Sequence, residues 1–340
     1  MQAIVCDLGG THLRCGVAGP SGAPEHVAKV HIENFLSGHG PSEIARRLVA
    51  RITAYAESVA GPVARDAPIV LSFPGPIGKG GRTLDAPTLF GEAGPPPDLV
   101  LELRRQTRRE VHTLNDLSAA AWRLAEVHTA VRFLVVATSS GIGSKIFDRR
   151  HADGVLDHPP YSGEIGHAVV DWGETAPRCD CGGRGHLGAV ASGRGIERSA
   201  RRRARHGPGA FARSLVSTWF GANAATLTNE VHLVPAALAG DRWALSVIED
   251  GTRYLARALG TVVLAAGVER VIVIGGFAAG LGPVYETMLR DLLRESCDYR
   301  LASPALADLV HVADAEEETC LEGAAVYARH LSQTPRNAVS

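Results

Sequence analysis

The sequence has no surplus of either charge and no long apolar run. Its 35 Lys and Arg residues stand against 36 Asp and Glu, which leaves a formal net charge of −1. This balance argues against a nucleic-acid partner, because such proteins carry a basic surplus. The longest apolar run, residues 259–268, is too short to cross a bilayer, and the opening MQAIVCDLGG shows no signal peptide. We therefore expect a cytoplasmic protein with no membrane partner.

Cysteines are few, and two of them are unusually placed. The 340 residues include six cysteines, which we expect to be reduced and mostly buried in a cytoplasmic chain. Cys179 and Cys181 differ, because they lie in the glycine-rich stretch CDCGGRGHLG (179–188). Their spacing is not the CxxC of redox motifs, so a redox role is disfavoured. A metal site and a turn without metal both remain open at this point.

Apolar runs that end in glycine alternate with stretches of helical spacing, and 45% of the residues are hydrophobic, enough for a sizeable core. Strands are predicted within residues 3–19, 67–78, 110–115, 131–148 and 268–280. Helices are predicted at residues 41–59, 116–127 and 241–267. This alternation indicates an α/β protein.

The segments 3–19 and 131–148 share one plan, a strand, a glycine turn and a second strand. The repetition suggests two related domains with a boundary near Asp116. The polar tail, residues 332–340, is predicted to be disordered.

Three glycine turns follow apolar strands: Gly9-Gly10-Thr11, residues 139–143 (SSGIG) and Gly275-Gly276. Glycines at such positions let backbone N–H groups approach an anion closely. None of the turns has the Gly-Lys-Ser/Thr of a P-loop or the GxGxxG of a dinucleotide site, and each alone is also compatible with a plain hairpin. The three together, with the acidic Asp7 at the first, favour binding of nucleotide phosphates.

Asp116 follows an apolar strand and precedes a helix. An Asp at that place commonly caps the helix. At a cleft between two domains, the same carboxylate can instead accept the proton of a substrate hydroxyl, which is the main chemical demand of phosphoryl transfer. The residues alone leave both roles open.

Six motifs occur together in one order: DLGGTHLR (7–14), LND (114–116), SSGIG (139–143), GEIGH (163–167), CDCGGRGH (179–186) and VIVIGG (271–276). Because these motifs occur in this order, the chain resembles the ROK family of sugar kinases over roughly residues 3 to 328. The resemblance implies a two-domain, actin-like or hexokinase-type ATPase fold with its active site in the interdomain cleft. It also implies a phosphotransferase with an alcohol group as acceptor. ROK repressors carry an N-terminal helix-turn-helix, for which we expect no room before Asp7.

The resemblance further implies how the chain is divided. Residues 1–116 would form a small N-terminal domain and residues 117–319 a large domain with the zinc loop. A C-terminal helix at about residues 320–331 would pack back on the small domain. ROK kinases are often dimers or tetramers, so a homodimer or homotetramer is expected.

The residues of the site are carried over position by position. Those expected to bind ATP and Mg²⁺ are Asp7, Gly9, Gly10, Thr11, Arg14, Ser139, Ser140, Gly141, Gly143, Gly275 and Gly276. Asp116 is the expected general base for a primary hydroxyl. The other expected substrate ligands are Gly75, Asn115, Glu164 and His167.

The family's zinc site implies a ligand set of His167, Cys179, Cys181 and His186. His186 stands where the family has a third cysteine, yet a Cys₂His₂ set is still a closed tetrahedral zinc site. Such a metal would be structural and would fix the loop that carries Glu164 and His167.

Two positions depart from the family pattern. Gly188 replaces a Glu that contacts the anomeric end of the sugar, and Thr88 replaces an Asn. Because a site built around a hydroxyl discriminates strongly, losing this acceptor should change the substrate. A hexose and a C7-cyclitol of the valiolone type, phosphorylated in aminocyclitol biosynthesis, are both expected acceptors. A sugar sensor without catalysis is a further alternative.

Overall fold

A computed structural model describes residues 2–61, 63–91, 97–297, 308–314 and 318–333. The chain divides into two compact units, each taken by itself below. Unit 1 comprises Met1–Thr129, Asp153–Ser162 and Glu316–Ser340. Unit 2 comprises Ala130–Ala152 and Gly163–Ala315. Among the described residues, no helix is both long and apolar enough to span a membrane.

Unit 1 is built on a five-stranded sheet in the order β3-β2-β1-β4-β5. Its strands are β1 (Ala3–Leu8), β2 (His12–Ala18), β3 (Glu25–His31), β4 (Ile69–Phe73) and β5 (Val111–Asn115). The first three strands pair antiparallel, and β1, β4 and β5 pair parallel. Every residue of β1 and β4 is buried, as expected for central strands covered on both faces.

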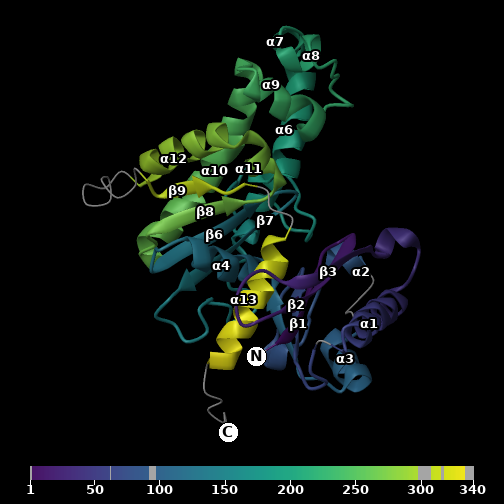
Figure 1. Ribbon diagram of the computed structural model, residues 1–340. Coiled ribbons are helices and arrows are strands. Elements are labelled where there is room, and N and C mark those ends of the chain that lie inside the picture. The colour runs from purple at the N-terminus through teal and green to yellow at the C-terminus, as the bar shows by residue number, and fades with distance from the viewer. Residues whose placement is uncertain (1, 62, 92–96, 298–307, 315–317, 334–340) are drawn as a thin grey trace. The chain divides into compact units, whose positions relative to one another are not determined.

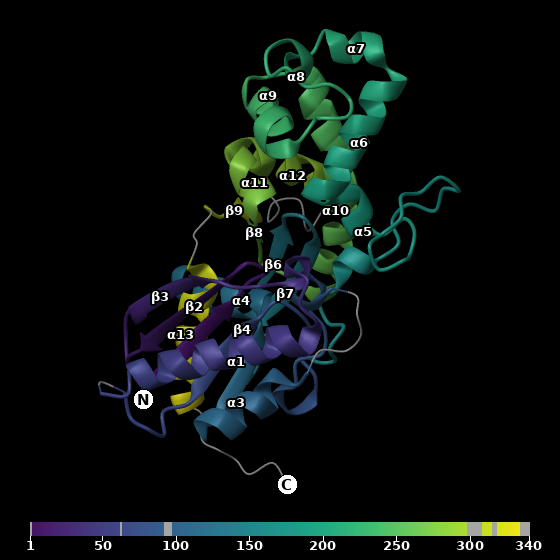
Figure 2. The same ribbon diagram turned by 90° about the vertical axis from the view of Figure 1, so that its right-hand side faces the viewer.

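Helices cover both faces of this sheet. On one face lie α1 (Pro41–Ser58) and α3 (Leu99–Thr107), as Figure 2 shows. On the other lie α4 (Asp116–Val127) and α13 (Thr319–Gln333), which run side by side (Figure 1). Gly323 makes this packing possible, because a Cβ there would lie 1.8 Å from the Ala119 carbonyl oxygen. The short elements of unit 1 are η1 (Phe35–Ser37), η2 (Lys79–Gly81) and α2 (Pro87–Phe90).

Unit 2 has a four-stranded sheet in the order β7-β6-β8-β9. Its strands are β6 (Arg132–Thr138), β7 (Ile142–Asp148), β8 (Arg270–Ile274) and β9 (Val310–Val312). As in unit 1, an antiparallel hairpin comes first and its first strand then pairs in parallel with a later strand. The predicted strand plan of residues 131–148 is confirmed.

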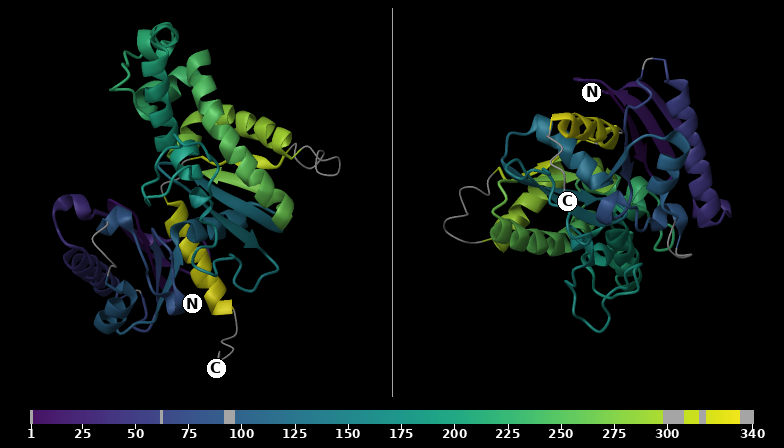
Figure 3. Two further views of the ribbon diagram at one scale, coloured as in Figure 1. Left: turned by 180° about the vertical axis from the view of Figure 1, so that it is seen from behind. Right: turned by 90° about the horizontal axis from the view of Figure 1, so that it is seen from below.

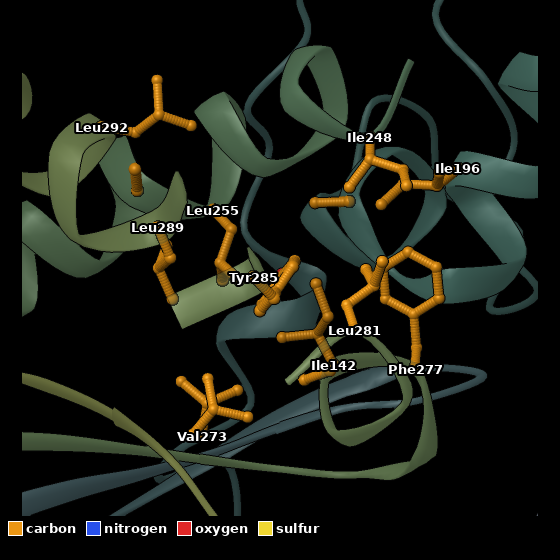
Figure 4. Packing of buried hydrophobic residues seen from close by; sticks show 14 of the residues in the cluster. Ile142, Ile196, Ile248, Leu255, Val273, Phe277, Leu281, Tyr285, Leu289 and Leu292 are labelled. Atoms are coloured by element: carbon orange, nitrogen blue, oxygen red, sulfur yellow. The ribbon is translucent and has the colours of Figure 1, made fainter. Parts of the chain in front are cut away.

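Helices pack on this sheet around one apolar cluster (Figure 4), in which the large side chain of Tyr285 is fully buried. The long α10 (Arg242–Ala266) and α12 (Pro283–Ser296) lie side by side (Figure 3, left). The remaining helical elements of the unit are η3 (Ile165–His167), α5 (Leu187–Ala191), α6 (Gly193–His206), α7 (Pro208–Ala212), α8 (Leu215–Thr218), the π-helical η4 (Asn229–Leu233), α9 (Val234–Leu238) and α11 (Gly276–Leu281).

The division into units differs from the predicted boundary at Asp116. Helix α4 and residues 153–162 belong to unit 1, because α4 buries its alanine-rich face beside α13. Helix α13 packs on the sheet of unit 1. Of the tail predicted to be disordered, residues 332 and 333 belong to α13, and residues 334–340 lie outside the described part of the chain.

Candidate active site and metal centre

The turn between β1 and β2 is a glycine loop closed at its base. The Gly9 N–H donates to the His12 carbonyl over 2.9 Å, and the Gly10 carbonyl accepts from the Asn34 amide over 2.9 Å. Thr11 is exposed at the tip of the turn. The loop therefore holds the predicted Gly9, Gly10 and Thr11 together. Thr88 lies beside it, since a Cβ on Gly10 would meet the Thr88 Cβ at 3.5 Å.

Asp7 lies at the end of β1 and is buried. Its carboxylate accepts hydrogen bonds from the Ser72 hydroxyl at 3.1 Å and from the Arg14 guanidinium at 3.4 Å. Burial raises the pKa of Asp7 above its usual value, although Ser72 and Arg14 act in the opposite direction. A nearby cation would stabilise the charged form of this buried carboxylate. Ser72 was not predicted, because nothing in the local pattern of β4 separates it from an ordinary strand residue.

Asn115 and Asp116 lie where β5 ends and α4 begins. The Asn115 side chain caps the helix by accepting from the Leu117 N–H at 3.0 Å, and its amide donates to the Gly75 carbonyl at 3.1 Å. Asp116 is the first helical residue, and its carboxylate accepts from the same N–H at 2.8 Å. The cap is therefore formed by Asn115. A helix N-terminus stabilises the negative charge of Asp116.

Gly75 is held against the segment before α2. A Cβ at this position would lie 1.8 Å from the Asp85 carbonyl oxygen, so no larger residue fits without a shift of the backbone. Cys320 on α13 reaches the same region of unit 1, and its thiol donates to the Asp116 backbone carbonyl over 3.4 Å. Burial raises the pKa of the Cys320 thiol, and the Asp7 and Asp116 carboxylates raise it further. Cys320 was not predicted either, because it lies far from Asp116 in the sequence.

Unit 2 contains a cavity of about 640 Å³ at the β6–β7 turn. The predicted residues Ser139, Ser140 and Gly276 line it. Gly141 and Gly143 are not in its lining, although Gly141 closes the turn by accepting from the Ser139 N–H over 3.1 Å. Its volume suits a small-molecule ligand.

Gly275 precedes α11 with φ 104°, a backbone conformation that other residues rarely adopt. It does not line this cavity itself. Polar groups from later elements also line the cavity, and sequence reasoning missed them: Arg194, Glu197, Thr228, Asn229 and Glu230.

Four predicted metal ligands meet in the loop beside α5. The potential ligand atoms of His167, Cys179, Cys181 and His186 all lie within 4.8 Å of one another. The Cys181 sulfur is 3.2 Å from His186 Nδ1, and the Cys179 sulfur is 4.0 Å from His167 Nδ1. Two thiolates and two imidazoles at such distances fit a tetrahedral metal ion, whose ligand bonds are about 2.0–2.3 Å long.

Backbone hydrogen bonds shape this loop, which Figure 2 shows beside α5. The Cys179 N–H donates to the Gly183 carbonyl over 2.8 Å, and the Gly182 N–H donates to the Cys179 carbonyl over 2.9 Å. Gly185 has a positive φ and sits against the Asp171 carbonyl, where a Cβ would come within 1.8 Å. The glycines of CDCGGRGHLG are thus what allows the turn to fold back on itself.

Glu164 precedes the short η3 turn and His167 ends it, and the His167 N–H donates to the Glu164 carbonyl over 3.0 Å. The neighbouring Gly166 packs tightly on β7, since a Cβ there would lie 2.1 Å from the Ile142 carbonyl oxygen. Gly188 lies on the other side of this turn, where a Cβ would meet the Gly166 carbonyl oxygen at 3.3 Å. The position that departs from the family pattern is therefore adjacent to the turn of Glu164 and His167.

Both units thus carry glycine turns of the kind found in phosphate-binding folds, and unit 2 adds a cavity. The sequence matches the ROK family over residues 3–330. The chain therefore belongs to the ROK family.

Two curated relatives and one solved structure illustrate the likeness. The chain is 37% identical to a C(7)-cyclitol 7-kinase of Streptomyces hygroscopicus subsp. limoneus, over 98% of this chain and 95% of the relative. It is 32% identical to a 2-epi-5-epi-valiolone 7-kinase of an Actinoplanes species, over 85% of this chain and 81% of the relative.

A ROK family glucokinase from Streptomyces griseus, solved with glucose and AMPPNP, aligns with a TM-score of 0.72 at 22% identity, over 97% of this chain and 99% of the other. The predicted fold class is confirmed. The predicted class of enzyme is confirmed as well: a kinase, that is, a phosphotransferase with an alcohol group as acceptor.

Proposed function

We propose that the protein transfers the γ-phosphoryl group of ATP to the exocyclic primary hydroxyl of a C7-cyclitol. The observation that carries this proposal is the likeness to a C(7)-cyclitol 7-kinase over nearly the full length of both chains. Gly188 supports the same acceptor. A carbocyclic ring has no anomeric centre, so it needs no carboxylate at this position. Since ATP is a cytoplasmic metabolite, we also propose a cytoplasmic location.

In this proposal Asp116 is the general base. Its carboxylate lies at the start of α4, and it takes the proton of the acceptor hydroxyl as the phosphoryl group arrives. Phosphoryl transfer depends mainly on position and on charge neutralisation, so holding this oxygen in line is as important as removing its proton. Asn115 and Gly75, which are hydrogen-bonded to each other, support the geometry of this corner.

In the same proposal, nucleotide contacts are assigned to each unit taken by itself. The cavity of unit 2 takes the nucleoside, with Ser139, Ser140 and Gly276 in its lining. The Gly9-Gly10-Thr11 loop offers the N–H groups of Gly10 and Thr11 to the phosphates, since that of Gly9 already donates to the His12 carbonyl, and Asp7 would hold Mg²⁺. Bound Mg²⁺ supplies charge neutralisation on the transferring phosphate oxygens. The buried Asp7, whose pKa is raised by burial, would then gain a second cationic partner beside Arg14.

We further propose that His167, Cys179, Cys181 and His186 hold a structural Zn²⁺. The support is the mixed thiolate and imidazole donor set and the mutual distances of its atoms. His167 belongs to the η3 turn, so an ion there would fix the position of Glu164 relative to β7. Glu164 would in turn accept hydrogen bonds from ring hydroxyls of the acceptor, and His167, with one ring nitrogen on the ion, would donate from the other nitrogen to a hydroxyl oxygen.

The test is a comparison of kcat/KM for two kinds of acceptor in an assay of ADP release. We expect C7-cyclitols of the valiolone type to exceed glucose, mannose, fructose, N-acetylglucosamine and N-acetylmannosamine by about 100-fold or more, because a site matched to particular hydroxyls discriminates strongly. Faster turnover of a hexose than of any cyclitol would contradict the proposed acceptor. No turnover with any acceptor, although ATP binds, would contradict the kinase and indicate a sensor.

The Gly188 position can be tested in the same assay. Gly188→Glu adds a carboxylate beside the η3 turn and should narrow the preference for cyclitol over glucose by about tenfold. Gly188→Ala is the matched control, because it adds only the Cβ that meets the Gly166 carbonyl oxygen at 3.3 Å. Equal effects of the two variants would mean that bulk, and not the missing carboxylate, sets the acceptor preference.

A further inference from the structure

Unit 2 contains a second concavity, which shares no lining residue with the nucleotide cavity. It encloses about 500 Å³ between the metal loop, α6 and α10. The two helices approach closely at Gly251, where a Cβ would lie 2.6 Å from Cγ1 of Ile196. Because the helix axes are close at this point, the long side chains on either side of the contact form the walls of a groove.

Four arginines line this groove, and we call it the arginine groove. Arg198 and Arg202 are one turn apart on α6, and Arg253 and Arg257 are one turn apart on α10.

Two carboxylates, Asp171 and Asp250, also line the groove. The Asp250 charge is already paired with Arg203 outside the groove, at 2.8 Å. Asp171 accepts from the Gly173 N–H at 2.9 Å. With four arginines against two aspartates, the lining itself carries a net charge of +2.

Two of the four guanidinium groups are available for a ligand. Arg253 is paired with Glu249 at 2.7 Å and with Glu295 at 2.8 Å, and Arg198 lies 3.7 Å from Asp180. Arg202 and Arg257, in contrast, are exposed and form no ion pair with any residue that the structure describes. Both guanidinium groups can therefore pair with an anion that enters from solution.

We propose that the arginine groove binds a small phosphate monoester. Guanidinium groups present planar pairs of N–H donors that match phosphate oxygens, and Arg202 and Arg257 bring such donors from opposite walls. Ser199 and Tyr254 line the same groove and offer hydroxyls to a polyol. The volume lies within the range of small-molecule sites, about 300–1,000 Å³. This site is separate from the proposed kinase chemistry and does not depend on it.

The test is calorimetric titration of the whole protein with glucose 6-phosphate. Saturating AMPPNP and Mg²⁺ are present, so that the nucleotide cavity is occupied. We expect binding at one site, weakened about tenfold or more in the double variant Arg202→Gln/Arg257→Gln, which loses two charge-assisted contacts. The matched control is Arg205→Gln/Arg213→Gln, which removes the same charge from exposed positions outside the groove. In the control, the affinity should stay within about twofold of the wild-type protein.

A parallel titration with inorganic phosphate distinguishes a site for a phosphate monoester from a site for free phosphate. The ester should bind more tightly, because Ser199 and Tyr254 add contacts to its polyol part. The assignment would be overturned by the absence of binding, by equal losses in the two double variants, or by equal affinities for the ester and inorganic phosphate. Because the substituted arginines are exposed, unchanged melting temperatures and an unchanged kcat should accompany the lost affinity.

Discussion

Asp116→Asn is expected to lower kcat by about 1,000-fold while the protein stays folded, since general-base catalysis contributes roughly 10²–10⁴-fold. The amide keeps the shape of the side chain but cannot take the proton of the acceptor hydroxyl. Stability should be little changed, because the cap of α4 is formed by Asn115 and remains intact. Steady-state kinetics with a C7-cyclitol and ATP, together with the melting temperature, measure both effects.

Asp66→Asn is the matched control for this prediction. Asp66 is exposed, and its substitution removes the same charge from unit 1 away from the end of β5. It should leave kcat unchanged and alter the melting temperature only slightly, because the Asp66 charge acts on the pKa of the buried Arg109 guanidinium. If Asp116→Asn retained a tenth of the wild-type rate, Asp116 would not be the base.

Cys181→Ser is expected to remove the bound metal, destabilise the protein and weaken acceptor binding. Its sulfur is one of four donor atoms that meet in the loop beside α5, and a closed structural site contributes its binding free energy to folding. The melting temperature should fall by about 5 °C or more, because roughly 2–4 °C is lost per kcal/mol in domains of 150–250 residues. KM for the acceptor should rise more than kcat falls, since the proposed metal would position Glu164 and would not touch the transferred phosphate.

Metal analysis and thermal melting with and without a chelator test this prediction. The wild-type protein treated with chelator should melt like Cys181→Ser, and the variant should not respond to chelator at all. Arg178→Ser serves as the control, because it changes an exposed residue of the same loop that is not a ligand. Freshly purified wild-type protein without metal, or with a melting temperature that the chelator does not change, would contradict a structural metal.

The strands and several helices were predictable because their signals are local. Residues 3–19 and 131–148 are apolar runs interrupted by glycine, and both fold as antiparallel hairpins. The boundary between the units was not predictable in the same way. It depends on contact between α4 and α13, which are far apart in the sequence and pack closely because Gly323 lacks a side chain. No pattern within either helix reveals its partner.

For the candidate site, the sequence likewise predicted residues within local motifs but not the contacts made by residues far away in the chain. Motifs pointed to Asp7, the glycine turns and the four candidate metal ligands, because each motif is contiguous in the sequence, and the structure brings those four candidate ligands together. The groups that hydrogen-bond to these residues come from elements that are far away in the sequence. Ser72 reaches Asp7 from β4, and Cys320 reaches Asp116 from α13. Their roles depend on tertiary packing, which the sequence pattern does not contain.

The most direct test of the account is to identify the product that the wild-type protein forms from ATP and a valiolone-type C7-cyclitol. Phosphorus and carbon NMR of the isolated product locate the phosphate by its coupling to carbon. The account predicts a single phosphate monoester on the exocyclic C7 oxygen, formed together with one ADP. A phosphate on a ring hydroxyl, or release of ADP and inorganic phosphate without any phosphorylated cyclitol, would contradict it.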